Sequence, residues 1–148
     1  MTTVAELLNL KDKRNHEVHT VRPDQMVIEA IRLMAEKNIG AVPVVKDGQV
    51  VGIVSERDYA RKMELEGRAS AGTAISQIMT HHVKTVGLTD GVSACMNIMT
   101  EGRLRHLPVV DDGKLVGLLS IGDLVKEAIA EQARLIDKMQ EYIRGESY

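Results

Sequence analysis

The chain contains no phenylalanine and no tryptophan, and only three of its 148 residues are tyrosine. Its hydrophobic core must therefore be built from aliphatic side chains, with eight methionines as flexible filler. The shortage of aromatic rings removes the surfaces on which proteins usually stack bases. The net charge of −2 offers no general attraction for a polyanion. A nucleic-acid-binding function is therefore disfavoured.

Cysteines and long apolar runs are also scarce. The single cysteine, Cys95, excludes an intrachain disulfide and fits a reducing compartment. No apolar run approaches the roughly 20 residues that span a bilayer. The sequence Met1-Thr2-Thr3-Val4 does not have the character of a signal peptide. We therefore expect a soluble cytoplasmic protein that folds as one compact unit or two small ones.

What the chain does contain is an internal repeat. Residues Val18 to Asp58 align without a gap with residues Val83 to Asp123, at a constant offset of 65, with 15 identities in 41 positions. A repeat of this length is a complete supersecondary unit that is used twice. We expect the two units to pack as a pseudo-twofold pair, with function in the cleft where they meet.

Each repeat predicts the order β-α-β-β-α. In the first repeat we expect strands at 18–21, 42–45 and 49–54 and helices at 25–37 and 56–66. In the second we expect strands at 83–86, 107–110 and 114–119 and helices at 90–101 and 121–144. Asp47-Gly48 and Asp112-Gly113 predict two-residue hairpins. The strands around the first helix of each repeat should be parallel, so the fold class is α/β (α+β) with two small mixed sheets and flanking helices.

The domain boundaries follow from the repeat. Residues 1–66 form the first repeat with an N-terminal helix, 67–74 a linker, 75–128 the second repeat and 129–148 a helical extension. Thr3 and Glu6 have the spacing of a capping box and predict a short helix through Leu8. Residues 9–17 are polar and predict a loop. The long last helix is expected to serve packing or dimerisation.

The sharpest local pattern is Gly52-x-x-Ser55-x-x-Asp58, which recurs as Gly117-x-x-Ser120-x-x-Asp123. In each copy a strand ends and a helix begins. One interpretation is a capping box, in which the serine hydroxyl binds a first-turn amide and the acid reaches back. The other is a polyol and phosphate site, in which the acid accepts hydrogen bonds from two ribose hydroxyls. Both interpretations can hold together.

These motifs, with Ala41-Val42-Pro43-Val44-Val45 and His106-Leu107-Pro108-Val109-Val110, make the chain similar to tandem CBS-domain proteins. This pair of domains, the Bateman module, is named after cystathionine β-synthase, and the resemblance covers about residues 4 to 128. It implies an adenosine-containing ligand in the cleft between the repeats: AMP, ADP, ATP, NAD or S-adenosylmethionine. The motif's acid would hold the ribose, and no obligatory cofactor is implied.

The resemblance also implies which residues form two candidate sites. In one site, Ser120 and Asp123 would act with Thr20, Ile39, Gly40 and Ala41. In the other, Ser55 and Asp58 would act with Thr85, Leu104, Arg105 and His106. Both family acids are present, so neither site is excluded.

The two sites should nevertheless differ in charge. The first repeat has the small residues Gly40 and Ala41 where the second has Arg105 and His106. Arginine and histidine supply donors and positive charge, so we expect these two to bind phosphate, the alternative being a solvated basic turn. Arg57 and Arg61, one helical turn apart, are further phosphate candidates, and a solvated helix face is equally compatible with them.

None of the remaining motifs indicates a catalytic site. His81-His82 lacks the cysteine, histidine or acid that would complete a metal site, so a surface turn is favoured. No nucleophile-base pair or Walker-type loop is present, so an enzyme acting on nucleotides is the weaker hypothesis. We expect a non-enzymatic regulatory module that senses the energy state through adenine nucleotides. It would signal to an effector protein or through a homodimer formed by helix faces. The alternative is a ligand-free protein-interaction scaffold.

Overall fold

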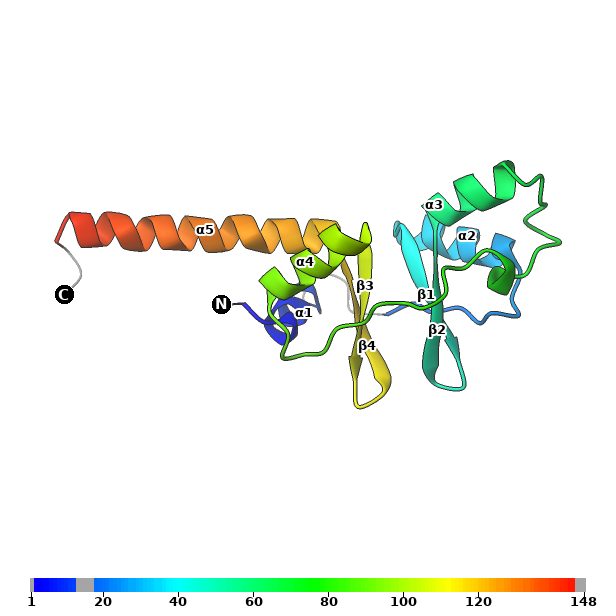
Figure 1. Ribbon diagram of the computed structural model, residues 1–148, viewed down its shortest axis with the longest axis horizontal. Coiled ribbons are helices and arrows are strands. Elements are labelled where there is room, and N and C mark those ends of the chain that lie inside the picture. Colours follow the sequence, from blue (N-terminus) through cyan, green and yellow to red (C-terminus); the bar gives the residue numbers. More distant parts are fainter. Residues whose placement is uncertain (1, 13–17, 146–148) are drawn as a thin grey trace. The chain divides into compact units, whose positions relative to one another are not determined.

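The structure, a computed structural model, describes residues 2–12 and 18–145 and forms two compact units (Figure 1). Of the described residues, 18–85 and 108–118 form one unit, which we call the Asp58 unit. Residues 2–12, 86–107 and 119–145 form the other, the Asp123 unit. The two units therefore do not coincide with the two repeats in the sequence. The predicted domain boundaries, which follow sequence order, stay a prediction.

The Asp58 unit has an aliphatic core, as its composition requires. Its elements are α2 (Val27–Lys37), β1 (Ala41–Lys46), β2 (Gln49–Ser55), α3 (Glu56–Asp58), a π-helical segment (Tyr59–Glu64) and a 3₁₀ turn (Ile75–Gln77). Val27, Ala30 and Met34 lie on the buried face of α2. They belong to one core cluster with Val42, Val44 and Val54 of the hairpin. The helix after Ser55 ends at Glu64 instead of the predicted 66, and its last six residues are wound as a π-helix.

The β1–β2 hairpin confirms the predicted turn. Asp47 and Gly48 have φ angles of 52° and 80°, which is the pair of positive values that a type I′ turn needs. The strands pair antiparallel from Lys46 with Gln49 to Ala41 with Ser55, with one irregularity between Val44 and Val45. This register places Ala41 directly beside the serine of the first motif.

The predicted first strand of each repeat is wrong in length. Within 18–21 only Val21 pairs, through one parallel bridge to Val44, and within 83–86 only Val86 forms a bridge. The amide that follows each bridge is bonded by a side chain three residues later. Arg22 N donates to Gln25 Oε1 at 2.7 Å and Gly87 N donates to Asp90 Oδ2 at 2.7 Å. These local bonds begin a turn directly after each predicted strand. Each sheet is therefore an antiparallel pair of strands. The parallel direction predicted for the first strand is seen only in the bridge from Val21 to Val44.

The segment that the sequence predicts to be a linker packs on α2. Val27 N donates to Thr73 O at 2.8 Å, and Ile28 N donates to Ser70 O at 3.1 Å. The first amides of a helix have no partner within the helix, and Met26 supplies no side-chain cap. The segment therefore replaces a capping side chain, and Thr73 is buried as a result.

The Asp123 unit is built from α1 (Val4–Asp12), α4 (Val92–Gly102) and α5 (Ile121–Ile143). Between α4 and α5 the chain forms the second hairpin, β3 (His106–Asp111) and β4 (Lys114–Ser120), of which residues 108–118 belong to the Asp58 unit. Its Asp112-Gly113 turn has φ angles of 51° and 76°. Cys95 is fully buried on α4. Residues 9–12, predicted to be a loop, continue α1, because the polar face of an amphipathic helix has the composition of a loop. The rest of that predicted loop, 13–17, lies outside the described residues.

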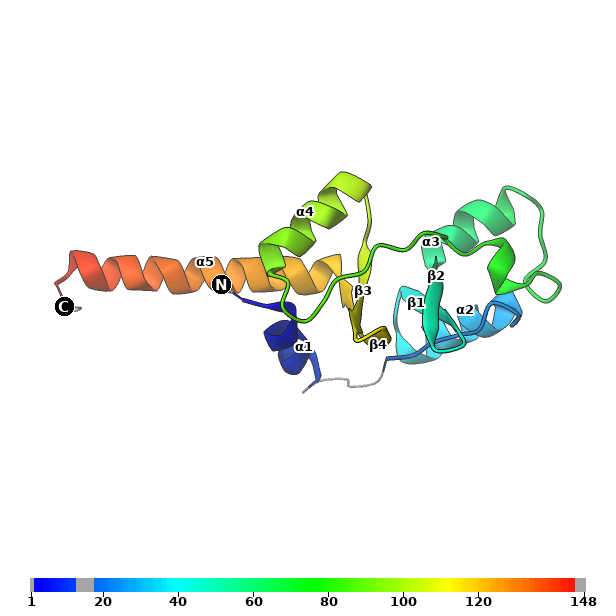
Figure 2. The ribbon, with the colours of Figure 1, turned by 60° about the horizontal axis from the view of Figure 1, so that its bottom comes forward.

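The N-terminal segment is fixed to α5 by a buried carboxylate. Glu127, only 6% exposed, accepts hydrogen bonds at 2.7 Å from the hydroxyl of Thr2 and from Arg134 Nη2. The bonds from Arg134 and Thr2 lower the pKa of Glu127, while its burial opposes them. Beyond this contact, α5 extends past α1 and α4 of its unit, as Figures 1 and 2 show. No helix in the described part of the chain is long and apolar enough to cross a membrane.

Candidate functional site

Both copies of the Ser-x-x-Asp motif form the predicted capping box. Asp58 N donates to Ser55 Oγ at 3.1 Å, and Ser55 N donates to Asp58 Oδ2 at 3.0 Å. The second copy has the corresponding bonds, Asp123 N to Ser120 Oγ at 3.2 Å and Ser120 N to Asp123 Oδ2 at 2.8 Å. Each serine has an extended backbone and each acid lies in the first helical turn. The motif therefore fixes a carboxylate at the end of a strand.

The glycine of the first motif allows a close crossing of the chain. A Cβ at Gly52 would lie 2.6 Å from Met79 Sδ and 3.0 Å from Thr80 O. The crossing segment pairs with β2, since Ile53 N donates to Thr80 O at 3.1 Å and Thr80 N donates to Ile53 O at 2.8 Å. The absence of a side chain at position 52 thus brings Thr80 to the motif's acid.

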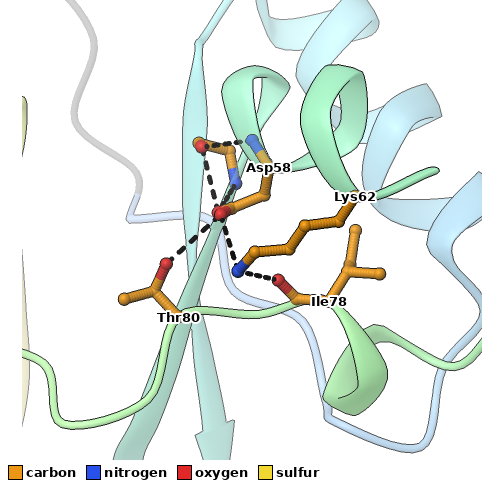
Figure 3. A network of polar contacts seen from close by, with 5 residues as sticks. Asp58, Lys62, Ile78 and Thr80 are labelled. Carbon is orange, nitrogen blue, oxygen red and sulfur yellow. Dashed lines mark hydrogen bonds and ion pairs between the residues drawn. The ribbon is translucent and has the colours of Figure 1, made fainter. Parts of the chain in front are cut away.

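Asp58 is surrounded by donors (Figure 3). Its Oδ2 accepts from the amide and from the hydroxyl of Ser55, both at 3.0 Å. Its Oδ1 accepts from Thr80 Oγ1 at 3.2 Å and from Lys62 Nζ at 3.1 Å. Lys62 also donates to the carbonyl of Ile78 at 2.9 Å. Asp58 thereby ties the start of α3 to the segment 78–80.

Asp123 has fewer partners: Ser120, through its amide and its hydroxyl, and Lys11. Besides the Ser120 amide, Lys11 Nζ of α1 donates to Oδ2 at 2.7 Å. Burial of the Asp123 carboxyl raises its pKa. The hydrogen bond and charge of Lys11 and the bonds from Ser120 more than offset this, so the pKa lies below its ordinary value. The acid is therefore ionised at neutral pH.

His106 lies close to Asp123 and Lys11. Burial lowers its pKa, the positive charges of Lys11 and Arg105 lower it further, and Asp123 opposes them. Arg105 is placed there because its carbonyl accepts from Ile121 N, the first residue of α5, at 2.8 Å. Lys11 and His106 therefore lie near the carboxylate of Asp123 at the start of α5, and the charge of Arg105 acts on His106.

The structure brings some of the predicted site residues together within a unit. In the Asp58 unit, Gly40 O accepts from Glu56 N at 3.0 Å and Ala41 pairs with Ser55. In the Asp123 unit, Arg105 and His106 lie beside Ser120 and Asp123. Each acid is thus accompanied by the residues that precede the hairpin of its own repeat. The pairing of each acid with the opposite repeat, which the resemblance implies, stays a prediction.

The other predicted residues lie at the surface or near it. Thr20, Thr85 and Arg57 are exposed, and Ile39 and Leu104 are half-buried. His81 and His82 are exposed. Within residues 2–12 and 18–145 no three His, Cys, Asp or Glu side chains are grouped to hold a metal ion.

Sequence reasoning missed Lys11, Lys62 and Thr80. Lys62 could have been found, because a lysine four residues after an acid on a helix is a standard ion-pair spacing. Lys11 is 112 residues from its partner and Thr80 is 22 residues from Asp58. No local pattern connects such distant positions.

The fold and the repeated capping acids define a tandem α+β module, and comparison with known proteins identifies its family. The profile of the CBS domain matches the chain twice, at residues 4–65 and 75–130. The chain belongs to the CBS-domain family, which confirms the resemblance drawn from the motifs.

Three similar proteins illustrate this relationship. The mitochondrial CBS domain-containing protein CBSX3 of Arabidopsis thaliana is 35% identical over 150 residues, covering 97% of this chain and 73% of CBSX3. A CBS-domain protein assigned to signal transduction in Burkholderia ambifaria MC40-6 is 51% identical with a TM-score of 0.83, covering 88% of this chain and 96% of that one. CBSX2, solved in complex with AMP, is 26% identical with a TM-score of 0.70, covering 88% and 98% of the two chains.

Proposed function

We propose that the protein is a non-enzymatic regulatory module that binds an adenosine-containing nucleotide, namely AMP, ADP, ATP or NAD, and passes this state to an effector protein. The supporting observation is the carboxylate that each Ser-x-x-Asp motif fixes at the first turn of a helix. A fixed carboxylate can accept hydrogen bonds from neighbouring ribose hydroxyls. The complex of the similar CBSX2 with AMP supports this ligand class.

The phosphate groups would be bound by basic side chains near the acid. Arg105 and His106 lie beside Asp123, and Lys11 is bonded to it. Arg57, exposed in the first turn after Ser55, would be the corresponding side chain if a nucleotide were also bound at Asp58. Because phosphate is doubly charged near neutral pH, binding should weaken as the salt concentration rises.

A thermal-unfolding panel tests this proposal. Wild type and Asp123→Ala are heated with AMP, ADP, ATP, NAD and S-adenosylmethionine, and Asp137→Ala, an exposed acid late in α5, serves as the matched control. A ligand at about 100 times its dissociation constant stabilises the folded state by about 2.7 kcal/mol, or several degrees. A shift that Asp123→Ala abolishes and Asp137→Ala retains supports the proposal. No shift with any compound would favour the protein-interaction scaffold.

We further propose that the chain forms a homodimer through α5. Six large apolar side chains on this helix are more than half exposed: Ile129, Leu135, Ile136, Met139, Tyr142 and Ile143. Ile129, Ile136 and Ile143 are seven residues apart and Met139 lies between the last two, which is the spacing of a coiled-coil seam. A helical segment of this length is marginal when it is solvated on all sides, so a second copy would stabilise it.

The oligomeric state tests this contact. Wild type should sediment as a dimer, and Ile136→Lys should shift it to a monomer, because the lysine charge would be buried in the seam. Asp137→Lys introduces the same side chain at the neighbouring position, outside the proposed seam, so this variant should remain dimeric. A wild-type monomer at all concentrations would contradict the proposed contact.

A further inference from the structure

The two motif acids differ in how many of their hydrogen-bond acceptor positions are occupied. A carboxylate has two oxygens with about two acceptor positions each. Asp58 is contacted by four donor groups: it accepts hydrogen bonds from the amide and hydroxyl of Ser55 on Oδ2 and from Thr80 on Oδ1, and Oδ1 also forms an ion pair with Lys62. All of its acceptor positions are therefore used within the protein.

Asp123 is only partly occupied. The Ser120 amide and Lys11 both donate to Oδ2, and the Ser120 hydroxyl adds a further contact. Within residues 2–12 and 18–145 no hydrogen bond to Oδ1 is formed. Its side chain is also more accessible, at 24% exposed against 13% for Asp58. The oxygen that remains can accept hydrogen bonds from a ligand without breaking any bond that the structure shows.

The donors on Asp58 are held firmly in place. Thr80 is fixed by two backbone bonds to Ile53. Lys62 is held at its other side by the carbonyl of Ile78 (Figure 3). A ribose on Asp58 would have to replace these bonds with new ones, so that the net gain is small and two protein donors lose their acceptor.

We infer that the chain binds one adenosine-type ligand through Asp123, and that Asp58, although it has the same motif, is a structural tie that binds no ribose. The inference rests on the proposed function and adds to it the number of ligands and the acid that binds the ribose. The ligand class is a nucleotide with both ribose hydroxyls, accepted by the open Asp123 Oδ1. The charge of Lys11 beside it favours a phosphorylated form over the neutral nucleoside.

Titration calorimetry with AMP measures both the number of ligands and the contribution of each acid. Wild type should bind one AMP per chain. Asp123→Asn should weaken binding at least about tenfold, since it removes a charged acceptor. Asp58→Asn should leave the stoichiometry unchanged and the affinity within about threefold, a difference below 1 kcal/mol. Circular dichroism of each variant verifies that it is folded.

A ligand variant separates a direct contact from a structural effect. 2′-Deoxy-AMP lacks one ribose hydroxyl, so it should bind more weakly than AMP to wild type and to Asp58→Asn. On Asp123→Asn this difference between the two ligands should disappear, because the acceptor of that hydroxyl is gone. If Asp58→Asn fails to fold, Lys62→Met replaces it. That change disturbs Asp58 without touching either capping box, and AMP affinity should be unchanged.

Two AMP molecules per chain would overturn the inference while leaving the proposed function intact. The same holds if Asp58→Asn or Lys62→Met weakens AMP as much as Asp123→Asn, or if the 2′-hydroxyl effect survives in Asp123→Asn. No binding of any adenosine compound to wild type would overturn the proposed function, and this inference with it.

Discussion

The two Ser-x-x-Asp motifs have the same capping geometry and different surroundings. Around Asp58, Lys62 from the following helical turn and Thr80 from the crossing segment both contact the carboxylate oxygen Oδ1. Around Asp123, one lysine from α1 shares the oxygen that already serves the cap. Capping and ligand binding draw on the same few acceptor positions. The repeated motif forms the cap in both copies, and residues elsewhere in the chain determine how many acceptor positions of the acid remain open.

The charges around the two acids sharpen this difference. His106 lies two positions before Pro108, whereas the corresponding position before Pro43 is occupied by the buried Ala41. Burial and the charges of Lys11 and Arg105 lower the pKa of His106, while the charge of Asp123 opposes them. The proposed phosphate-binding side chains lie at this acid, whereas Asp58 is paired with Lys62, which follows it on the same helical stretch.

The largest expected loss of stability comes from Gly52, where residues 79 and 80 cross β2 and bring Thr80 to Asp58. Gly52→Ala places a methyl group 3.0 Å from the backbone oxygen of Thr80, and overpacking of this kind costs about 1–3 kcal/mol. Urea denaturation should show this loss of stability. Met79 Sδ, at 2.6 Å, can move aside as the end of a flexible side chain, but the Thr80 carbonyl is held by the pairing with β2.

Gly72→Ala is the matched control for this experiment. A Cβ at Gly72 would meet nothing within 4 Å, so its stability should equal that of wild type or exceed it slightly. If Gly52→Ala were as stable as Gly72→Ala, residues 79 and 80 would not lie against β2, and the closed state of Asp58 would lose its support.

An intermediate effect should separate the two acids in the absence of ligand. Asp58→Asn disturbs the cap, the ion pair with Lys62 and the bond from Thr80, so it should lower the free energy of unfolding by about 2 kcal/mol. Asp123→Asn disturbs the cap and one half-exposed ion pair, and should cost about 1 kcal/mol. Urea denaturation of both variants measures the difference. Equal losses, or a larger loss at Asp123, would contradict the comparison between a structural acid and a ligand-binding acid.

The sequence predicts the local features of this fold well. The Asp-Gly turns, the helix starts at Ser55 and Ser120 and the buried Cys95 each depend on a few neighbouring residues. The first strand of each repeat was too long: only Val21 and Val86 form bridges, and a turn held by Gln25 or Asp90 follows directly. Hydrophobic patterns do not show how many residues of an apolar run find a pairing partner.

In the candidate site, too, some features can be predicted from the local sequence and others cannot. Its two acids follow from the motif, because their position depends only on the local helix start. Lys11 lies in the part of α1 that the sequence predicted to be a loop, and Thr80 reaches Asp58 only because Gly52 admits the crossing segment. Both contacts depend on tertiary packing, so no pattern of neighbouring residues distinguishes the closed acid from the open one.

The smallest expected effect concerns the ion pair that accompanies the open acid. Asp123 has a pKa below the ordinary value of 3.8 in the folded protein. A carboxyl group with a lowered folded pKa stabilises the protein above its unfolded pKa, and this contribution is lost as the pH falls through the folded value. Lys11→Met should therefore cost less than about 1 kcal/mol at pH 7, because the pair is partly exposed. The difference from wild type should shrink below about pH 4.

The neighbouring histidine reports the same change more directly. The charge of Lys11 lowers the pKa of His106, so Lys11→Met should raise that pKa toward the ordinary value of 6.5, with burial still holding it below. An NMR titration of the His106 ring measures this shift. Lys138→Met, which removes an exposed lysine far along α5, should leave the titration unchanged. If Lys11→Met also left it unchanged, Lys11 would not lie at the acid, and the phosphate preference inferred for the Asp123 site would lose its electrostatic basis.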